Sequence, residues 1–499
     1  MIPQFSRDDL KGIFHYTGKL IILLGYLFLI PLFVALIYKE WNPALDFIFS
    51  SLLSFSIGYL IIWRYHQALD INWRQGMTIA SLIWLVYMFL GAIPLYLSGH
   101  YNLYIDACFE SMSALTTTGL ILVKNLDHMA HSYNFWRHFM CFIGGQGIIL
   151  LGLLVFFRGA NAFKIYVGEA REEKILPNVV QTAKFIWLVS MCYLIIFALI
   201  LGIINIIHGI LPSRSFFHAI CIFMAGWDTA GFSVQSQNIS YYHSIVIEII
   251  TLIIVILGAV SFGLHYAVWT GKFREILRNF EFKIFLISII LLTLFTSVGF
   301  MKFTKNIDFF SSFRIIFYNI ISGHTGVGYT NTDSYYLKNY FPDFSLILLI
   351  IAMGLGGCSC STSGGIKMLR IGLFLKELKK EVRGYSLPSS TVVVEKFHHI
   401  KDISLTDIQV KLSSIILIIF VATYIIGGII GTFFGYPFLH SLFESTSACA
   451  NVGLSVGITN SNMPNLLKLT YIIEMWIGRL EFISIFVFIR FLFSLRSPE

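Results

Sequence analysis

The sequence predicts an all-α polytopic membrane protein with four pseudo-symmetric repeats of span, pore loop and span around one pore, preceded by two extra spans. Three observations predict this fold. The 499 residues are 57% hydrophobic but only 12% charged, whereas a soluble domain carries about 25% charged residues. Ten apolar runs are long enough to cross a bilayer. A short apolar run that ends in a glycine-containing polar stretch occurs four times among them.

This composition excludes a soluble enzyme, a nucleic-acid-binding protein and a disordered chain. The net charge of +8 is expected to lie in cytoplasmic loops beside the lipid bilayer, so it implies no nucleic-acid partner. The seven cysteines show no paired C-x-x-C spacing, and we expect no disulfide framework.

The first two spans are predicted at 20–38 and 45–63. The first run lacks a small-residue cleavage site, so we expect a retained span rather than a signal peptide. These runs define an N-terminal extension, residues 1–75.

The rest of the chain alternates long apolar runs with shorter ones. The long runs fall at 77–97, 136–157, 184–208, 243–268, 283–301, 344–375, 411–434 and 466–491. The short runs, 104–115, 215–227, 309–321 and 437–449, cannot cross a bilayer and indicate re-entrant pore helices. We therefore predict repeats at 76–181, 182–282, 283–410 and 411–499.

An internal repeat supports this division. Residues 109–120 are FESMSALTTTGL and residues 443–454 are FESTSACANVGL, identical at seven of twelve positions. The other two copies, CIFMAGWDTAGF at 221–232 and YNIISGHTGVGY at 318–329, are weaker. All four copies place a glycine before an apolar residue at the same point.

Basic residues concentrate in 64–76, 158–184, 269–283 and 370–411. The positive-inside rule then places both termini in the cytoplasm and all four pore loops outside. The long charged segment 376–411 is the expected docking surface for a soluble partner.

The four glycine stretches predict a cation-binding ring. Backbone carbonyls can replace the hydration shell of an ion, and glycine adopts the positive φ that such a turn requires. A ring with few carboxylates favours K⁺ over a divalent ion, and its one acid, Asp228, either adds field strength or caps the turn. The ring residues are Thr116, Thr117, Thr118, Gly119, Asp228, Thr229, Ala230, Gly231, Thr325, Gly326, Val327, Gly328, Ala450, Asn451, Val452 and Gly453.

Residues 354–365 interrupt the run 344–375 and are too rich in Gly, Ser and Thr for a straight helix. Gly354 lies 26 residues after Gly328, as Arg479 lies 26 residues after Gly453, so we expect a mobile loop and a cation at one depth that together form a gate. The alternatives are a plain kink, a weak C-x-C metal site, and a structural pairing of Arg479 with Glu474, Glu481 or helix-end carbonyls. The gate residues are Gly354, Gly356, Gly357, Ser359, Ser361, Thr362, Ser363, Gly364, Gly365 and Arg479.

Glu110 and Glu444 occupy the same place in two pore helices. We expect them to accept hydrogen bonds from backbone N–H groups behind the ring, the alternative being direct contact with the ion. Six histidines lack metal-ligand spacing and are expected at the solvent edge: His100, His128, His131, His324, His398 and His399.

The stretches TTTGL, DTAGF, TGVGY and ANVGL, with GGCSCSTSGGIK before a basic tail, resemble the Trk/Ktr/HKT superfamily of cation transporters, and the two added spans resemble its TrkH type. The resemblance implies K⁺ as the transported ion, no organic cofactor, a homodimer with one pore per protomer, and a cytoplasmic nucleotide-binding regulator of the TrkA type. It also implies that the ring is a selectivity filter and that Gly354–Gly365 and Arg479 form the gate. Related chains that prefer Na⁺ often carry Ser for the first filter glycine, so Gly119 favours K⁺. Cys358 and Cys360 depart from the usual composition of the gating loop.

We therefore expect gated K⁺ uptake across the plasma membrane of a prokaryote, either a bacterial inner membrane or an archaeal cell membrane. A secondary transporter with inverted repeats is disfavoured, because the four repeats share one orientation. Coupling to Na⁺ or H⁺ on the same fold, as a cation symporter, stays open. The sequence shows no nucleophile–base pair and no His/Glu ligand set at helical spacing, so we do not expect an intramembrane enzyme.

Overall fold

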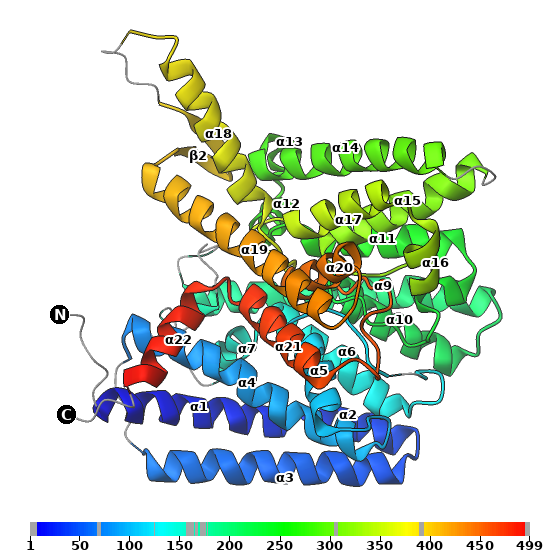
Figure 1. The fold of residues 1–499 in the computed structure, drawn as a ribbon. Coiled ribbons are helices and arrows are strands. Elements are labelled where there is room, and N and C mark those ends of the chain that lie inside the picture. Colours follow the sequence, from blue (N-terminus) through cyan, green and yellow to red (C-terminus); the bar gives the residue numbers. More distant parts are fainter. Residues whose placement is uncertain are drawn as a thin grey trace.

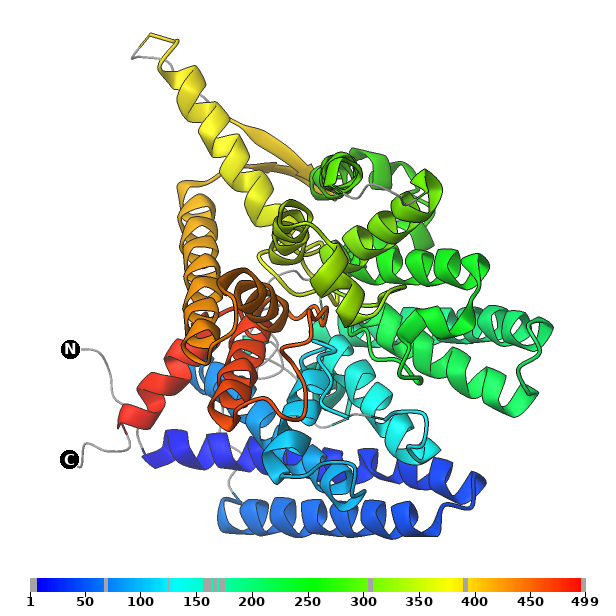
Figure 2. The ribbon, with the colours of Figure 1, turned by 45° about the vertical axis from the view of Figure 1, so that its right-hand side comes forward.

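The computed structural model describes residues 7–66, 71–123, 125–155, 164, 168–169, 176, 178–303, 308–388 and 394–494. These residues are mostly α-helical, as the sequence predicted (Figure 1). Helix α1 begins and helix α22 ends on the same side of the molecule (Figures 1 and 2). The basic segment predicted at 158–184 lies largely outside the described residues.

The N-terminal extension contains α1 (Arg7–Leu27), α2 (Leu29–Ile37) and α3 (Trp41–Arg64). The first span starts well before the predicted residue 20 and is interrupted at Phe28. Pro31 explains the interruption, because a proline has no N–H and its ring clashes with the carbonyl four residues before it.

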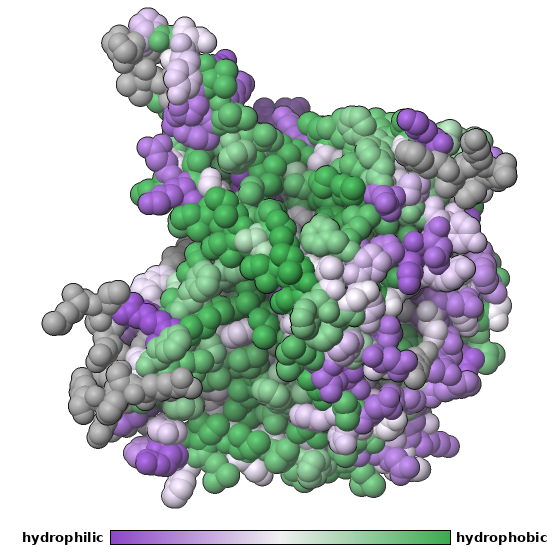
Figure 3. Space-filling model, viewed as in Figure 1, coloured by the Kyte–Doolittle hydropathy of each residue, from purple (hydrophilic) through white to green (hydrophobic). Residues whose placement is uncertain are grey.

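The outer face of α3 is strongly apolar. Trp41, Leu45, Leu60 and Trp63 are each more than 60% exposed, which a soluble protein would avoid but a lipid-facing helix requires. Figure 3 shows hydrophobic residues covering the middle of the visible face, with hydrophilic residues gathered at its right and upper-left margins. This pattern fits a protein that spans a bilayer.

Each repeat contains a first span, a short pore helix and a second span. The first spans are α4 (Trp73–Leu97), α9 (Val179–Ile207), α14 (Phe280–Phe303) and α19 (Asp407–Phe433). The pore helices are α5 (Tyr104–Leu115), α10 (Pro212–Trp227), α15 (Phe309–Thr325) and α20 (Phe438–Cys449). The connections carry η1 (Asn238–Tyr242), α13 (Arg274–Arg278) and α16 (Ser334–Tyr340).

The second spans differ from the prediction, because every one of them is broken rather than only the third. They consist of α6 (His131–Gln146) with α7 (Ile148–Val155), α11 (Ile245–Ala259) with α12 (Phe262–Trp269), α17 (Asp343–Leu355) with α18 (Met368–Gly384), and α21 (Asn465–Arg479) with α22 (Ile483–Ser494). The first two pairs bend by 78° and 101°.

The breaks have local causes. Gly147, between α6 and α7, has φ 99°, and Ser261 caps α12 by accepting a bond from the Leu264 N–H at 3.3 Å. Glu481 and Phe482 both have positive φ, 53° and 70°, which ends α21. In the described residues six helices are long and apolar enough to cross a membrane, and the bent pairs raise this number to eight. The runs 344–375 and 466–491, expected as the other two spans, are made of shorter helices.

A two-stranded antiparallel hairpin lies between α18 and α19, where no strand was expected. It pairs β1 (Lys396–His399) with β2 (Lys401–Ser404), and Ile400 at its turn has φ 63°. The His398 ring lies 2.7 Å from carboxylate oxygens of both Glu275 and Asp402. These two contacts, first with Glu275 and then with Asp402, raise the pKa of His398 above its ordinary value.

Candidate functional site

The four pore helices end in segments with one shared backbone conformation. In each segment φ is positive at the second and fourth residues: 57° and 84° at Thr117 and Gly119, and 55° and 95° at Asn451 and Gly453. The corresponding pairs in the other two segments are Thr229 with Gly231 and Gly326 with Gly328. The residue between each pair does not have positive φ. Such alternation turns successive peptide groups toward the same side.

The same backbone hydrogen bond anchors each segment to its own pore helix. The N–H of the third residue donates to the carbonyl five residues earlier. The four bonds are Thr118 to Ser113 at 2.8 Å, Ala230 to Ala225 at 2.7 Å, Val327 to Ser322 at 3.0 Å, and Val452 to Ser447 at 2.9 Å. This recurrence shows that the two weaker copies of the sequence repeat share the geometry of the two stronger ones.

The four segments contact one another in cyclic order. A Cβ added at Gly119 would lie 1.9 Å from the Ala230 carbonyl oxygen, and one at Gly231 would lie 1.9 Å from the Val327 oxygen. The remaining two contacts are Gly328 to the Val452 oxygen at 2.0 Å and Gly453 to the Thr118 oxygen at 2.2 Å. Each glycine therefore lies against a carbonyl of the next segment, and no side chain fits at any of the four.

This ring brings four equivalent carbonyls together, those of Thr118, Ala230, Val327 and Val452. Oxygen dipoles held on several sides of one axis are suited to a monovalent cation that has lost its water. On one side of the ring lies a cavity of about 250 Å³, lined by three of the ring glycines and by polar residues such as Ser236, Asn238 and Thr330. The ring thus opens to a vestibule with a partly polar lining.

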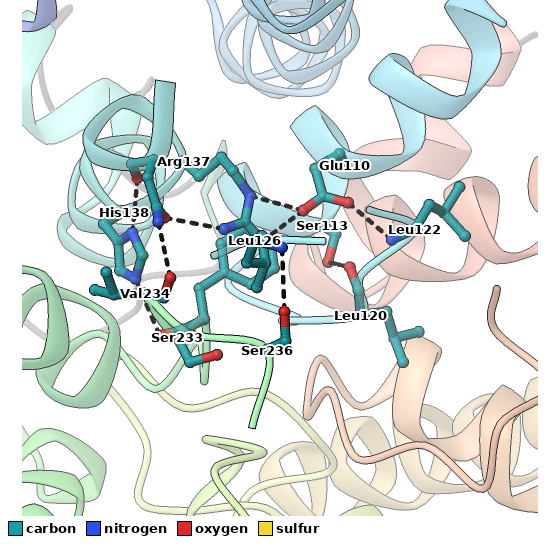
Figure 4. Close-up of polar contacts among 12 residues, drawn as sticks. Glu110, Ser113, Leu120, Leu122, Leu126, Arg137, His138, Ser233, Val234 and Ser236 are labelled. Atoms are coloured by element: carbon teal, nitrogen blue, oxygen red, sulfur yellow. Dashed lines mark hydrogen bonds and ion pairs between the residues drawn. The ribbon is translucent and has the colours of Figure 1, made fainter. Parts of the chain in front are cut away.

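Carboxylates behind the ring brace the chain that leaves it. Glu110 accepts a bond from the Leu122 N–H at 2.9 Å and receives the Arg137 guanidinium at 2.7 and 2.8 Å (Figure 4). Both side chains of this ion pair are fully buried. Glu444 accepts bonds from the N–H groups of Val456 at 3.0 Å and Ile458 at 3.1 Å. The two acids hold the exits of the first and fourth segments in place.

The fully buried Asp228 lies beside the break between α6 and α7. Its Oδ1 accepts a bond from the Gln146 amide at 2.8 Å, and a Cβ on Gly145 would lie 2.4 Å from the same oxygen. The carboxylate therefore connects the second pore helix to the second span of the first repeat.

The loop 354–365 lies at the end of the ring formed by the first and second residues of the segments, which we call its inner end. The Thr362 hydroxyl lies 2.9 Å from the carbonyl oxygens of Trp227 and Gly258. A Cβ on Gly364 would lie 2.2 Å from the Ala450 oxygen, and one on Gly326 would lie 3.0 Å from the Ser363 hydroxyl. Residues 362–364, at the end of the loop, thus contact the end of the second pore helix and the third and fourth segments, on the side opposite the vestibule.

Arg479 joins this loop to the first repeat. Its guanidinium donates to the carbonyls of Thr362 at 2.8 Å and Gly144 at 2.7 Å, and lies 3.4 Å from the Thr117 hydroxyl. It also lies over the Trp84 ring, 5.8 Å from its centroid. A fixed positive charge therefore lies beside the inner end of the ring.

The acids near Arg479 in the sequence make other contacts. Glu481 pairs with Arg370, and Glu474 accepts a bond from the Ser445 hydroxyl at 3.0 Å. A small cavity of about 40 Å³ is lined by Arg479, Lys367, Glu169 and Glu481 together with Cys360 and other loop residues. Both signs of charge are thus present on the inner side of the loop.

Several residues of this site were not anticipated from the sequence. Arg137, and the buried pair of Lys468 with Asp106 at 2.6 Å, are charges in or beside predicted membrane runs and could have been found by the rule that singled out Arg479.

His324 was expected at the solvent edge but is fully buried, with its Nε2 2.7 Å from the Ser288 hydroxyl. The expectation was wrong because His324 lies at the inner end of a pore helix. His399 is also buried, at 7% exposure.

Comparisons with known proteins give one consistent answer. The family model TrkH, described as cation transport protein, matches residues 45–495. An uncharacterized cation transporter of Methanocaldococcus jannaschii is 32% identical over 488 residues, 97% of this chain and 96% of that protein. The Trk system potassium uptake protein TrkG of Escherichia coli K12 is 28% identical over 494 residues, 97% and 98% of the two chains. The crystal structure of the potassium transporter TrkH from Vibrio parahaemolyticus has the same fold, with a TM-score of 0.80 at 24% identity over 96% of this chain and 98% of that one.

Proposed function

The chain belongs to the TrkH family of cation transport proteins, as its motifs indicated, and from that premise we propose that it takes up K⁺ across the plasma membrane of a prokaryote. The ion passes through a selectivity filter made by residues 116–119, 228–231, 325–328 and 450–453. The loop 354–365 and Arg479 form a gate below this filter. K⁺ is the transported ion, and the chain needs no organic cofactor.

One observation carries this proposal: the cyclic contact of four glycines with the carbonyls of the neighbouring segments, at 1.9 to 2.2 Å from an added Cβ. A ring closed by backbone alone leaves carbonyl oxygens as the ligands, and the ring residues include a single carboxylate, Asp228, which is bonded to Gln146. Carbonyl ligation suits K⁺, whereas Ca²⁺ and Mg²⁺ sites in proteins are usually built with carboxylates.

The gate is supported by where the loop lies. Gly364 lies against the Ala450 carbonyl of the filter, and Thr362 bonds to the Trp227 carbonyl at the end of the second pore helix, so an ion leaving the filter meets the loop. The Arg479 charge repels a cation there, and this repulsion is far stronger in a partly dry cavity than in water.

The orientation and the partners follow from the charge pattern and the family. Both termini and the hairpin-bearing segment 376–411 face the cytoplasm, because the basic segments share that side. A cytoplasmic nucleotide-binding subunit of the TrkA type docks there and regulates the gate. The protein works as a homodimer with one pore in each protomer. We divide each protomer into an extension, 1–75, and repeats at 76–181, 182–282, 283–410 and 411–499.

The test is ion flux in proteoliposomes that contain the purified chain. We expect K⁺ and Rb⁺ to enter down their gradients faster than Na⁺, with or without a pH gradient. Equal rates for K⁺ and Na⁺ would refute the filter assignment. Uptake that requires a Na⁺ or H⁺ gradient would replace the passive pathway with a coupled symporter on the same fold.

A further inference from the structure

The start of α14 carries a buried carboxylate that contacts the gating loop. Glu281 is the second residue of this helix and is 1% exposed. Its Oε1 accepts two backbone hydrogen bonds, one from the Ser359 N–H at 2.6 Å and one from the Leu369 N–H at 3.0 Å. Ser359 lies in the loop 354–365, and Leu369 lies in the first turn of α18, which follows the loop. One oxygen therefore joins the loop to the next helix.

This arrangement compensates for a poor helix cap. Lys367, the N-cap residue of α18, has φ 79° and makes no capping bond with its side chain. The first N–H groups of a helix have no partner within the helix and attract negative charge. Glu281 supplies both the acceptor and the charge from a different span, so the start of α18 and the loop are held by the same group.

The carboxylate also meets the cytoplasmic hairpin. Its Oε2 lies 3.9 Å from the His399 Nδ1 on β1, and the same ring nitrogen lies 3.3 Å from the side-chain amide of Asn279. Asn279 in turn accepts a bond from the Phe282 N–H at 3.0 Å and so caps α14. The hairpin thus touches the group that holds the loop, although it lies outside the membrane runs.

We propose that Glu281 is a positioning residue that holds the loop 354–365 beneath the filter, and that the β1–β2 hairpin controls this hold through His399. The proposal rests on the proposed function in taking the loop as the gate. A partner that shifts the hairpin weakens the hold of Glu281 on Ser359 and releases the loop from the filter. The link needs no change in the filter itself.

Cys358 provides a readout of loop release that does not depend on flux. Its side chain is fully buried, and its N–H donates to the Ala259 carbonyl at 2.9 Å. Cys192 and Cys360 are the two cysteines that are not buried. In a full-length chain with Cys192→Ser and Cys360→Ser, alkylation of Cys358 by N-ethylmaleimide, located by mass spectrometry, therefore measures how often the loop opens.

The experiment compares Glu281→Ala with Glu281→Gln in proteoliposomes without a regulator. We expect Glu281→Ala to raise the Cys358 labelling rate by about tenfold or more, because a lost hydrogen bond to a charged group shifts an equilibrium by at least that factor, and to raise the K⁺ flux. Glu281→Gln keeps one acceptor oxygen, so its increase should be smaller. His399→Ala should raise labelling in the same direction.

The matched control is Glu40→Gln. Glu40 also caps a helix on another span, accepting bonds from the N–H groups of His131 at 2.7 Å and Ser132 at 3.0 Å at the start of α6. This variant should leave the labelling of Cys358 unchanged. An increase equal to that of Glu281→Gln would mean general loosening of the structure and would overturn the proposal.

Folded Glu281→Ala protein with parental labelling and flux would also overturn it, and unchanged labelling in His399→Ala would refute the role of the hairpin. A variant with a shortened loop is measured in the same series. If it conducts no faster than the parent, the gate in the proposed function fails, while the labelling still decides whether Glu281 holds the loop.

Discussion

Replacing Gly119 by Ser should reduce the preference of the pore for K⁺. The new Cβ would lie 1.9 Å from the Ala230 carbonyl oxygen, while ordinary contact begins at 3.4 Å, so this oxygen must move by about 1.5 Å. A carbonyl displaced so far no longer coordinates the ion together with the other three. We expect the K⁺/Na⁺ permeability ratio to fall by at least about tenfold, which corresponds to about 1.4 kcal/mol.

The strain of the left-handed backbone must be separated from this contact. Gly119 has φ 84°, and a side chain there costs about 1–2 kcal/mol whatever its surroundings. Gly209 has φ 87° but nothing within 4 Å of an added Cβ, so Gly209→Ser carries the same strain without the clash. Permeability ratios from reversal potentials, measured for both variants, decide the matter. An unchanged ratio in folded Gly119→Ser, or an equal loss in Gly209→Ser, would refute the reasoning.

Three further predictions concern the gate and the hairpin. Shortening the loop 354–365 should raise K⁺ flux in proteoliposomes, and a folded variant no faster than the parent would contradict the gate. Arg479→Ala should raise maximal flux and Arg479→Lys should keep most of the barrier; well-expressed Ala protein with lower uptake would leave only a structural role, through the carbonyls of Thr362 and Gly144. Glu275 and Asp402 raise the pKa of His398 in the folded protein. The protonated ring therefore stabilises the hairpin fully below the unfolded-state pKa of about 6.5, and this stabilisation is lost as the pH rises through the folded-state pKa. Amide-exchange protection of the hairpin, corrected for intrinsic rates, should fall over that range, and His398→Asn should abolish this dependence.

The spans and pore helices could be predicted because their signals are local. The pore helices expected at 104–115 and 437–449 are observed within one residue, at Tyr104–Leu115 and Phe438–Cys449. Hydropathy sets their length, and the glycine stretch sets where each one ends. The fold class was therefore available from the sequence alone.

The breaks in the second spans could not be predicted in the same way. Hydropathy is continuous across Gly147 and across Val260 and Ser261, and both glycine and serine are common where membrane helices pack together. At the first break Gly145 also packs against Asp228 of the second segment, and this contact depends on the fold. Only the third repeat has enough glycine and serine to reveal its interruption.

The long-range pairs were also beyond the sequence. Lys468 and Asp106 are 362 residues apart, and Arg137 and Glu110 are 27 apart. A charge within an apolar run indicates that the charge has a partner, but the identity of that partner depends on the fold. The hold of Glu281 on Ser359 and Leu369 belongs to the same class.

The central claim is that the four segments form one K⁺ site with backbone ligands. The most direct measurement is the anomalous scattering of Rb⁺, a close substitute for K⁺, in crystals of the protein. The account predicts Rb⁺ peaks on the axis between the carbonyls of Thr118, Ala230, Val327 and Val452, displaced by excess K⁺ but not by the same concentration of Na⁺. An intact ring with no Rb⁺ on its axis, or one emptied equally by Na⁺, would contradict the claim.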